Sequence, residues 1–335
     1  MSTPLHDTPV SVLDLSPILR GGSVADALHR SLDLAQHVER RGFKRYWVAE
    51  HHNMAGIASA ATAVVIGYLA AGTSKIRVGS GGVMLPNHAP LVIAEQFGSL
   101  GSLYPNRIDL GIGRAPGTDP LTIRALRRDP RIHADDFPNL LEELRRYFEP
   151  NRSSAGVRAM PAEGADVPIW LLGSSDYSAQ LAGSLGLPFA HAGQFAAENT
   201  ERALAAYRSS FRPSKVLQQP YAILGVSVVA ADTMEKARYL STTLQQRLLA
   251  MIRGRLRTSQ MVPPVESMDG LWDDGEKAMV ESRMRAAIIG DPTTVGEQLA
   301  SLIEATQVDE LIITSDIYDH ADRLRSFEII GDLKV

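Results

Sequence analysis

Short apolar runs alternate with longer helical patterns along almost the whole chain. The runs are rich in Val, Ile and Leu, and most are followed by a segment with apolar residues at helical spacing. A run and its helix form a βα unit, and such units in series build a parallel sheet. The eight runs cover residues 10–15, 46–49, 76–85, 108–112, 168–172, 187–193, 222–230 and 310–314. Eight units predict an α/β fold, a (β/α)8 TIM barrel with inserted loops, whose site lies at the carboxyl ends of the strands.

An open doubly wound sheet is the alternative fold for the same alternation. Its phosphate-binding signature, Gly-x-Gly-x-x-Gly, does not follow the first run. A chain of 335 residues with 44% hydrophobic content can form one barrel-sized domain or two smaller ones. We expect a single barrel domain over residues 1–335, with an insertion at about 116–166, where the alternation lapses and one helix is expected near 137–148. A long irregular segment at about 258–285 is a candidate lid.

The composition excludes several classes of protein. The 34 basic and 38 acidic residues leave a net charge of -4, which gives no electrostatic reason to expect a nucleic-acid or membrane partner. The chain has no cysteine, so disulfides, thiolate catalysis and cysteine-ligated metals are excluded. The N-terminus lacks the apolar core of a signal peptide, and no run reaches the roughly 18 apolar residues of a membrane span. We therefore expect a cytoplasmic protein.

Glycines and polar side chains gather where the predicted strands end. The segment 79–90 joins the third strand to a helix through Gly81 and Gly82, whose lack of Cβ atoms lets the backbone lie flat against a planar ligand. An ordinary glycine-rich turn would explain the same pattern. In a barrel all the strand ends meet at one rim. The residues expected together at that rim are Glu50, His51, His52, Gly81, Gly82, Asn87, Arg114, Ser174, Ser175, Ser178 and His191.

The run Glu50-His51-His52 directly follows the second predicted strand. Adjacent residues at a strand end point in alternating directions, so the three make a poor metal chelate, and we expect no metal site. Two interpretations stay open for the histidines. They are either rim residues satisfied by water and neighbours, or one of them acts as an acid, a base or a hydrogen-bond donor near neutral pH.

The fifth strand leads into a helix through Gly173-Ser174-Ser175. This turn offers free backbone N–H groups, two hydroxyls and the positive end of a helix dipole, which together suit a phosphate. Ser178 can turn its hydroxyl to the same place, and Arg114 at the end of the fourth strand can grip phosphate oxygens. A simple helix cap at the serines and a surface salt bridge at Arg114 are the alternatives.

Three segments at these strand ends, 46–52, 78–88 and 107–114, resemble the bacterial luciferase-like family of flavin-dependent monooxygenases, and the resemblance extends from the first strand to Ile313. It implies a barrel that holds FMN, or in some branches the deazaflavin coenzyme, at its C-terminal mouth. It also implies that His51 is the active-site histidine and that the peptide between Gly81 and Gly82 is cis. Light emission and aldehyde specificity are not implied, because the reactive cysteine of luciferase is missing.

The resemblance further assigns the cofactor contacts and the chemistry. Arg114, Ser175 and Ser178 match the phosphate-binding arginine and hydroxyls. The full expected cofactor-binding set is Gly81, Gly82, Asn87, Arg114, Gly173, Ser174, Ser175 and Ser178. The expected function is oxygenation of a small organic substrate by reduced FMN and dioxygen, with a separate NAD(P)H:flavin reductase as partner and a homodimer as the assembly. The alternatives are an FMN- or deazaflavin-dependent hydride-transfer oxidoreductase and a non-catalytic flavin-binding protein.

Overall fold

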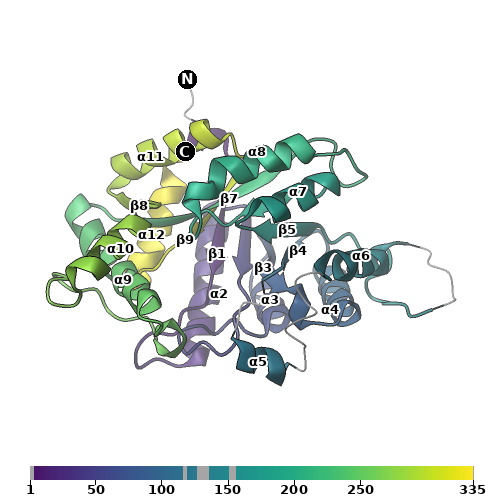
Figure 1. Cartoon of the computed structure of the whole chain (residues 1–335), viewed down its shortest axis with the longest axis horizontal. Coiled ribbons are helices and arrows are strands. Elements are labelled where there is room, and N and C mark those ends of the chain that lie inside the picture. The colour runs from purple at the N-terminus through teal and green to yellow at the C-terminus, as the bar shows by residue number, and fades with distance from the viewer. Residues whose placement is uncertain (1–3, 116–118, 127–135, 151–155, 335) are drawn as a thin grey trace.

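The computed structural model of the chain describes residues 4–115, 119–126, 136–150 and 156–334. Parallel strands form one sheet that closes into a barrel, because β6 pairs with β7 as well as with β5. The barrel strands, in order around the ring, are β1 (Val10–Asp14), β2 (Arg45–Val48), β3 (Arg77–Met84), β4 (Ile108–Gly113), β5 (Ile169–Gly173), β6 (Phe189–His191), β7 (Ala222–Ala230) and β9 (Glu310–Thr314). The predicted eight-stranded TIM barrel is therefore confirmed, and the open doubly wound sheet is wrong (Figure 1).

The sequence did not reveal a ninth strand, β8 (Ala287–Gly290). This strand lies outside the ring and pairs with the last residues of β7, from Ser227 to Ala230. The first residues of β7, from Ile223 to Ser227, pair instead with β9 and so belong to the barrel wall. One edge of β7 thus passes from β9 to β8 along its length, while its first residues also pair with β6 on the other edge. Its apolar run gave no sign of where the change from β9 to β8 occurs.

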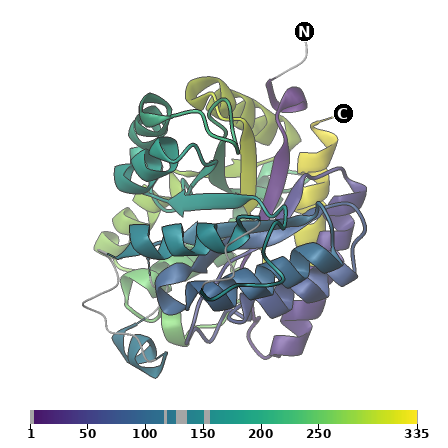
Figure 2. The same ribbon diagram turned by 90° about the vertical axis from the view of Figure 1, so that its right-hand side faces the viewer.

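Helices surround the barrel on its outer face, as the two views at right angles show (Figures 1 and 2). The α-helices are α1 (Pro4–Asp7), α2 (Val24–Arg40), α3 (Thr62–Ala71), α4 (Pro90–Leu103), α5 (Pro120–Ala125), α6 (Phe137–Phe148), α7 (Asp176–Ser184), α8 (Thr200–Ser210), α9 (Met234–Ile252), α10 (Asp274–Met284), α11 (Pro292–Thr306) and α12 (His320–Asp332). Short 3-10 turns lie at η1 (Leu85–Asn87), η2 (Ala197–Asn199) and η3 (Leu256–Thr258). Several begin where the sequence indicates: Ser23 caps α2 through a reciprocal capping box, and Pro90 is the first residue of α4.

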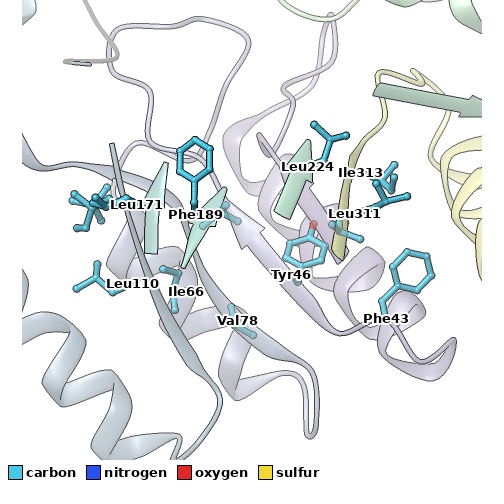
Figure 3. Close-up of a cluster of buried hydrophobic side chains, with 14 of the residues drawn as sticks. Phe43, Tyr46, Ile66, Val78, Leu110, Leu171, Phe189, Leu224, Leu311 and Ile313 are labelled. Carbon is cyan, nitrogen blue, oxygen red and sulfur yellow. The ribbon is translucent and has the colours of Figure 1, made fainter. Parts of the chain in front are cut away.

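The strands bury both faces, which explains their nearly continuous apolar runs. One set of side chains points outward and packs beneath the helices, as Tyr46, Val78 and Phe189 do (Figure 3). The alternate set fills the barrel interior, where the Trp47 and Trp170 rings meet edge to face with centroids 5.4 Å apart. The interior is therefore packed, and space for a ligand has to come from the mouth and its loops.

A buried ion-pair network lies within the strands, far from the polar rim. The guanidinium of Arg45 donates from Nη1 to Asp109 Oδ2 at 2.9 Å and from Nε to Glu310 Oε1 at 2.7 Å. It also stacks 4.4 Å from the centre of the Trp170 ring. Arg45 opens β2, and Glu310 opens β9, so this network belongs to the amino end of the barrel, where conserved chemistry in such folds serves stability rather than catalysis.

The expected insertion and the candidate lid both contain a helix, of which the first was expected and the second was not. Within 116–166, α6 packs against α4 and buries Phe137, Leu141 and Leu144, so this part of the expected insertion is a member of the helical layer. Residues 116–118, 127–135 and 151–155 of that region lie outside the described residues. Within 258–285, residues 274–284 form α10, whose N-terminus carries a capping box between Asp273 and Glu276. The irregular part of the candidate lid is thus shorter than expected.

No helix in the portion of the chain that the structure describes combines the length and the apolar character that a membrane span requires.

Candidate active site

The carboxyl ends of β2, β3, β4 and β5 lie side by side, because these strands are consecutive neighbours in the barrel. His51 follows β2, Gly81 and Gly82 lie in β3, and Arg114 follows β4. Ser174 and Ser175 come directly after β5. Residues that are more than a hundred positions apart in sequence are therefore brought to one rim by the order of the strands.

The peptide bond between Gly81 and Gly82 is cis, as the resemblance implies. The pairing register between β3 and β4 shifts at the same place, between Ser80 and Val83. A Cβ atom on Gly81 would lie 2.6 Å from Leu13 Cδ1, and one on Gly82 would lie 2.9 Å from the Gly111 carbonyl oxygen. Close packing within the barrel thus leaves room for glycine alone at both positions.

Ser175 occupies the N-cap position of α7 but does not cap the helix. Its φ and ψ are extended, as a cap requires, yet its side chain makes no capping hydrogen bond. The first N–H groups of α7 are therefore not satisfied by this hydroxyl, which argues against the simple helix-cap interpretation. Ser178, in the first turn of α7, is buried and packs on Gly173, where a Cβ atom would come within 2.4 Å of Ser178 Cβ.

Arg114 reaches the same helix start from β4. Its guanidinium carbon lies 4.6 Å from the centre of the Tyr177 ring, and Tyr177 is the residue before Ser178. A stacked guanidinium is oriented and keeps its N–H groups at the edge, where they can bind an oxyanion. Backbone N–H groups, two serine hydroxyls and an arginine thus converge on the start of α7, and the donor set fits a phosphate monoester.

His51 is partly buried and continues the inward-facing positions of Trp47 and Ala49. Burial lowers its pKa to about 4, and the positive charge of Arg247 contributes in the same direction. The imidazole is accordingly neutral at pH 7. Its Nδ1 is buried and has no hydrogen-bond partner among the described residues. A neutral imidazole has one donor and one acceptor nitrogen, so His51 can hold or accept a proton at the mouth.

Glu50 joins the neighbouring loops instead of facing a substrate. Its Oε1 lies 2.8 Å from both His52 Nε2 and His88 Nε2, and its Oε2 accepts the Met84 N–H at 3.1 Å. Burial alone would raise the pKa of Glu50, but these hydrogen bonds outweigh it and lower the pKa to about 2. An ionised carboxylate only accepts, so both ring nitrogens donate to it. The expected alternation of side chains is correct, since Glu50 and His52 share a side, but their common partner His88 was not anticipated in this role.

The Glu50, His52 and His88 atoms lie within 4.8 Å of one another, the spacing from which a metal site could be built. Their 2.8 Å contacts are hydrogen-bond distances, shorter than the roughly 3.3 Å that separates ligands of a tetrahedral zinc ion. The geometry is that of a carboxylate with two N–H donors, which fixes the ends of β2 and β3 relative to each other.

Two further residues that we expected at the rim, Asn87 and His191, lie in other surroundings. Asn87 is buried and donates from Nδ2 to Glu50 Oε1 at 3.4 Å, so it belongs to the Glu50 cluster. His191 shares the outward side of β6 with Phe189, whose ring centre is 6.2 Å away, and is almost fully buried. It therefore does not join His51 at the inner face of the mouth. The period-2 alternation within 189–191 would have indicated this orientation.

A cavity of about 1040 Å³ opens on the other half of the mouth. It is bordered by the ends of β1, β7 and β9, by α9, and by residues 259–262 of the candidate lid. Ser227, Arg247 and Asp316 lie on its wall and were not among the predicted site residues. The rule that placed Arg114 at a strand end applies equally to Asp316, which follows β9. It does not apply to Ser227, which lies inside the run 222–230, and nothing in the sequence shows that α9 directs Arg247 inward. Among the described residues, the expected cofactor-binding set does not border this cavity.

Comparison with known proteins identifies a family for this chain. Residues 9–310 match the family described as luciferase-like monooxygenase. The uncharacterised protein YvbT of Bacillus subtilis is 57% identical over 328 residues, which are 98% of this chain and 97% of YvbT. A luciferase-like monooxygenase of Escherichia coli is 50% identical over 324 residues, 97% of this chain and 96% of that one. The N-acetyl-S-alkylcysteine monooxygenase of B. subtilis is 32% identical over 329 residues, covering 96% and 97%.

Several solved structures superimpose on nearly the whole of this chain. Apo-MsnO8 superimposes with a TM-score of 0.87 at 34% identity, over 97% of this chain and 98% of its own. The oxygenating constituent of 3,6-diketocamphane monooxygenase of Pseudomonas putida, in complex with FMN, gives 0.71 at 19% identity, over 97% and 96%. An F420-dependent secondary alcohol dehydrogenase with an F420-acetone adduct gives 0.70 at 11% identity, over 98% and 99%. The last two share the fold. With the family match spanning most of the barrel, the chain belongs to the luciferase-like monooxygenase family.

Proposed function

We propose that this protein is a flavin-dependent monooxygenase that uses reduced FMN and dioxygen to oxygenate a small organic substrate. The observation that carries the proposal is the donor set at the start of α7. Ser175 stands at the cap position without capping, and Arg114 is held beside it by stacking on Tyr177. A terminal phosphate would satisfy these donors together, and the family membership makes a flavin phosphate the natural occupant.

The chain's own residues have three tasks in this scheme. Arg114, Ser175 and Ser178 bind the phosphate and so orient the ring toward β3, where Gly81 and Gly82 lie. His51, neutral at pH 7, holds or accepts a proton at the mouth. The candidate lid, which borders the cavity, excludes water if it closes. When bound, reduced FMN supplies two electrons, so that one oxygen atom enters the substrate and the other leaves as water.

The choice of coenzyme is part of the proposal. The diketocamphane monooxygenase constituent is in complex with FMN and the secondary alcohol dehydrogenase is F420-dependent, but both share only the fold with this chain. We propose FMN and keep the deazaflavin coenzyme as the less favoured alternative. A separate NAD(P)H:flavin reductase and a homodimeric assembly are likewise proposals from the resemblance. The cytoplasmic location stays a prediction from the sequence.

The test is to load the protein with reduced FMN without oxygen and then mix it rapidly with dioxygen while absorbance is recorded. A long-lived species, distinct from reduced and oxidised FMN, would support monooxygenase chemistry. Reoxidation as fast as that of free FMN would favour hydride transfer, and failure to bind FMN would make F420 the coenzyme to test. Binding without any transient or turnover of tested substrates would favour a flavin carrier.

A further inference from the structure

Several buried polar atoms that border the cavity have no partner in the described part of the chain. They are Ser227 Oγ, Ser315 Oγ, Arg323 Nε and Gln194 Oε1. Ser227, Ser315 and Arg323 are only 8%, 5% and 4% exposed. A buried polar atom without a hydrogen bond is destabilising by about 1–3 kcal/mol, and native proteins rarely leave one unexplained. Four such atoms in the residues of one cavity wall leave hydrogen-bonding capacity there that the described residues do not use.

The two hydroxyls lie on neighbouring strands, where the pairing of β7 with β9 ends. Ser227 in β7 is paired in register with Thr314, the last residue of β9, and Ser315 is the next residue along the chain. Both can donate, and Arg323 Nε always carries a hydrogen. Three of the four unsatisfied atoms are therefore hydrogen-bond donors, which suit an anion.

Arg247 brings a guanidinium to this wall from α9. Its Nη1 donates to Asp316 Oδ1 at 2.5 Å, which orients the side chain, and its side chain remains 27% exposed. A guanidinium has five N–H donors in a fixed fork, so a single contact leaves others for a ligand. The positive charge of Arg247 also helps to lower the pKa of His51.

The charge around the cavity points to an anion. Seven arginines but only two acidic residues, Glu198 and Asp316, border it. Three of these arginines are ion-paired and so contribute fixed donors more than net charge: Arg323 with Asp14 at 2.8 Å, Arg247 with Asp316, and Arg253 with Glu276 at 2.6 Å. The other four arginines, Arg20, Arg255, Arg283 and Arg285, make the cavity wall electropositive, which attracts anionic ligands.

The cavity faces the phosphate seat from across the barrel. In the ring of strands β9 is opposite β4, which leads to Arg114, and β1 is opposite β5, which leads to Ser175. We propose that Arg247, Ser227 and Ser315 form a second oxyanion subsite, which holds a carboxylate or similar anionic group of the substrate. This inference rests on the proposed function for the identity of the substrate site. The phosphate of the coenzyme is the other anionic group that these donors would bind.

The test compares hexanoate with hexanamide, which has the same chain but no charge. Their binding to the FMN-loaded protein and to the protein without FMN is measured by calorimetry. The variants are Arg247→Gln, Ser315→Ala and Ser227→Ala, with Arg325→Gln as control, because Arg325 forms an exposed ion pair with Asp232 outside the cavity. Melting curves establish that each variant is folded. If Arg247→Gln does not fold, because Asp316 is left unpaired, the serine variants still decide the question.

Hexanoate is expected to bind at least about tenfold more tightly than hexanamide, because its carboxylate makes a charge-assisted hydrogen bond that the neutral amide lacks. Arg247→Gln and the serine variants should remove most of this preference and leave FMN affinity within about twofold, whereas Arg325→Gln should change neither. Equal binding of the two probes, or no binding of either, would overturn the subsite. Weaker FMN binding in the variants with an unchanged hexanoate preference would overturn it too, and would assign the donors to the coenzyme. If wild-type protein binds hexanoate but not FMN, the proposed function falls and the subsite stands.

Discussion

Arg114 and Tyr177 are stacked with 4.6 Å between the guanidinium carbon and the ring centre, and this contact ties the end of β4 to the first turn of α7. Since β4 and β5 are neighbours, the stack determines where the arginine stands relative to Ser175. The contact thus brings Arg114 and Ser175, which follow two different strands, into one candidate phosphate site.

Replacing Arg114 by Ala is expected to weaken FMN binding by about 1.5–3 kcal/mol, because a charge-assisted hydrogen bond to the phosphate is lost. Flavin fluorescence titration measures the effect. Arg146→Ala is the matched control, since Arg146 forms an exposed pair with Glu142 on α6 and should leave the affinity unchanged. Equal affinities of the wild type and Arg114→Ala would remove Arg114 from the phosphate site.

His51→Ala should keep flavin binding and lower turnover by about a hundredfold or more, because a positioned proton donor or acceptor is removed. Single-turnover kinetics with saturating reduced FMN measures the chemical step. The exposed His29 on α2 offers a control, and His29→Ala should behave as the wild type. Unchanged turnover in His51→Ala would make His51 an ordinary rim residue.

The low pKa of His51 predicts a pH dependence of stability. The unfolded chain binds a proton at the ordinary pKa of 6.5, whereas the folded protein does so only at about 4. His51 therefore favours unfolding progressively as the pH falls from 6.5 to 4, by an amount on the order of 1–3 kcal/mol. Denaturant unfolding of the wild type and His51→Gln across this range should show the stability of the wild type falling more steeply. Parallel curves for the two proteins would contradict the lowered pKa.

Glu50→Gln should reduce the free energy of unfolding by about 1–3 kcal/mol, because two partly buried ring N–H donors lose an ionised, buried acceptor. The low pKa of Glu50, about 2, means that this stabilisation is present above the ordinary pKa of 4.5 and is lost as the pH falls toward 2. Denaturant unfolding at neutral pH is the measurement. Glu142→Gln, an exposed change on α6, should alter stability by less than about 0.5 kcal/mol, and an equally small effect at Glu50 would refute the role given to it.

Gly173→Ala should weaken FMN binding by about tenfold, since the new Cβ would lie 2.4 Å from Ser178 Cβ and displace that serine from the start of α7. In contrast, Gly67→Ala within α3 meets its nearest atom, Leu100 Cδ2, at 3.5 Å and should be neutral or stabilising. Titration with FMN and thermal melting of both variants separate the local effect from a general loss of stability. Normal FMN affinity in a folded Gly173→Ala protein would show that Ser178 does not contact the phosphate.

Much of the fold follows from local patterns. The period-2 and period-3.6 repeats correctly located the eight barrel strands, and their number led to the closed ring. The local patterns missed two elements. The helix α10 has a weak apolar pattern, and β8 is a short run that, among the described residues, pairs only with the far end of β7. The helix α6 was recognised as a helix, but its place in the outer layer depends on contacts with α4.

The sequence by itself determined which side chains stand at the mouth, because parallel strands in a barrel end on the same side and residues at those ends need no further contact to be there. This holds for His51, Gly81, Gly82, Arg114 and Ser175, whose roles stay predictions. Only the tertiary structure decided which of them meet, and how their charges behave. The Glu50 and His88 contact, the burial that lowers the pKa of His51, and the cavity of Ser227 and Arg247 all depend on loops and helices folding over the barrel. Such contacts join residues far apart in the chain, and a local repeat carries no information about them.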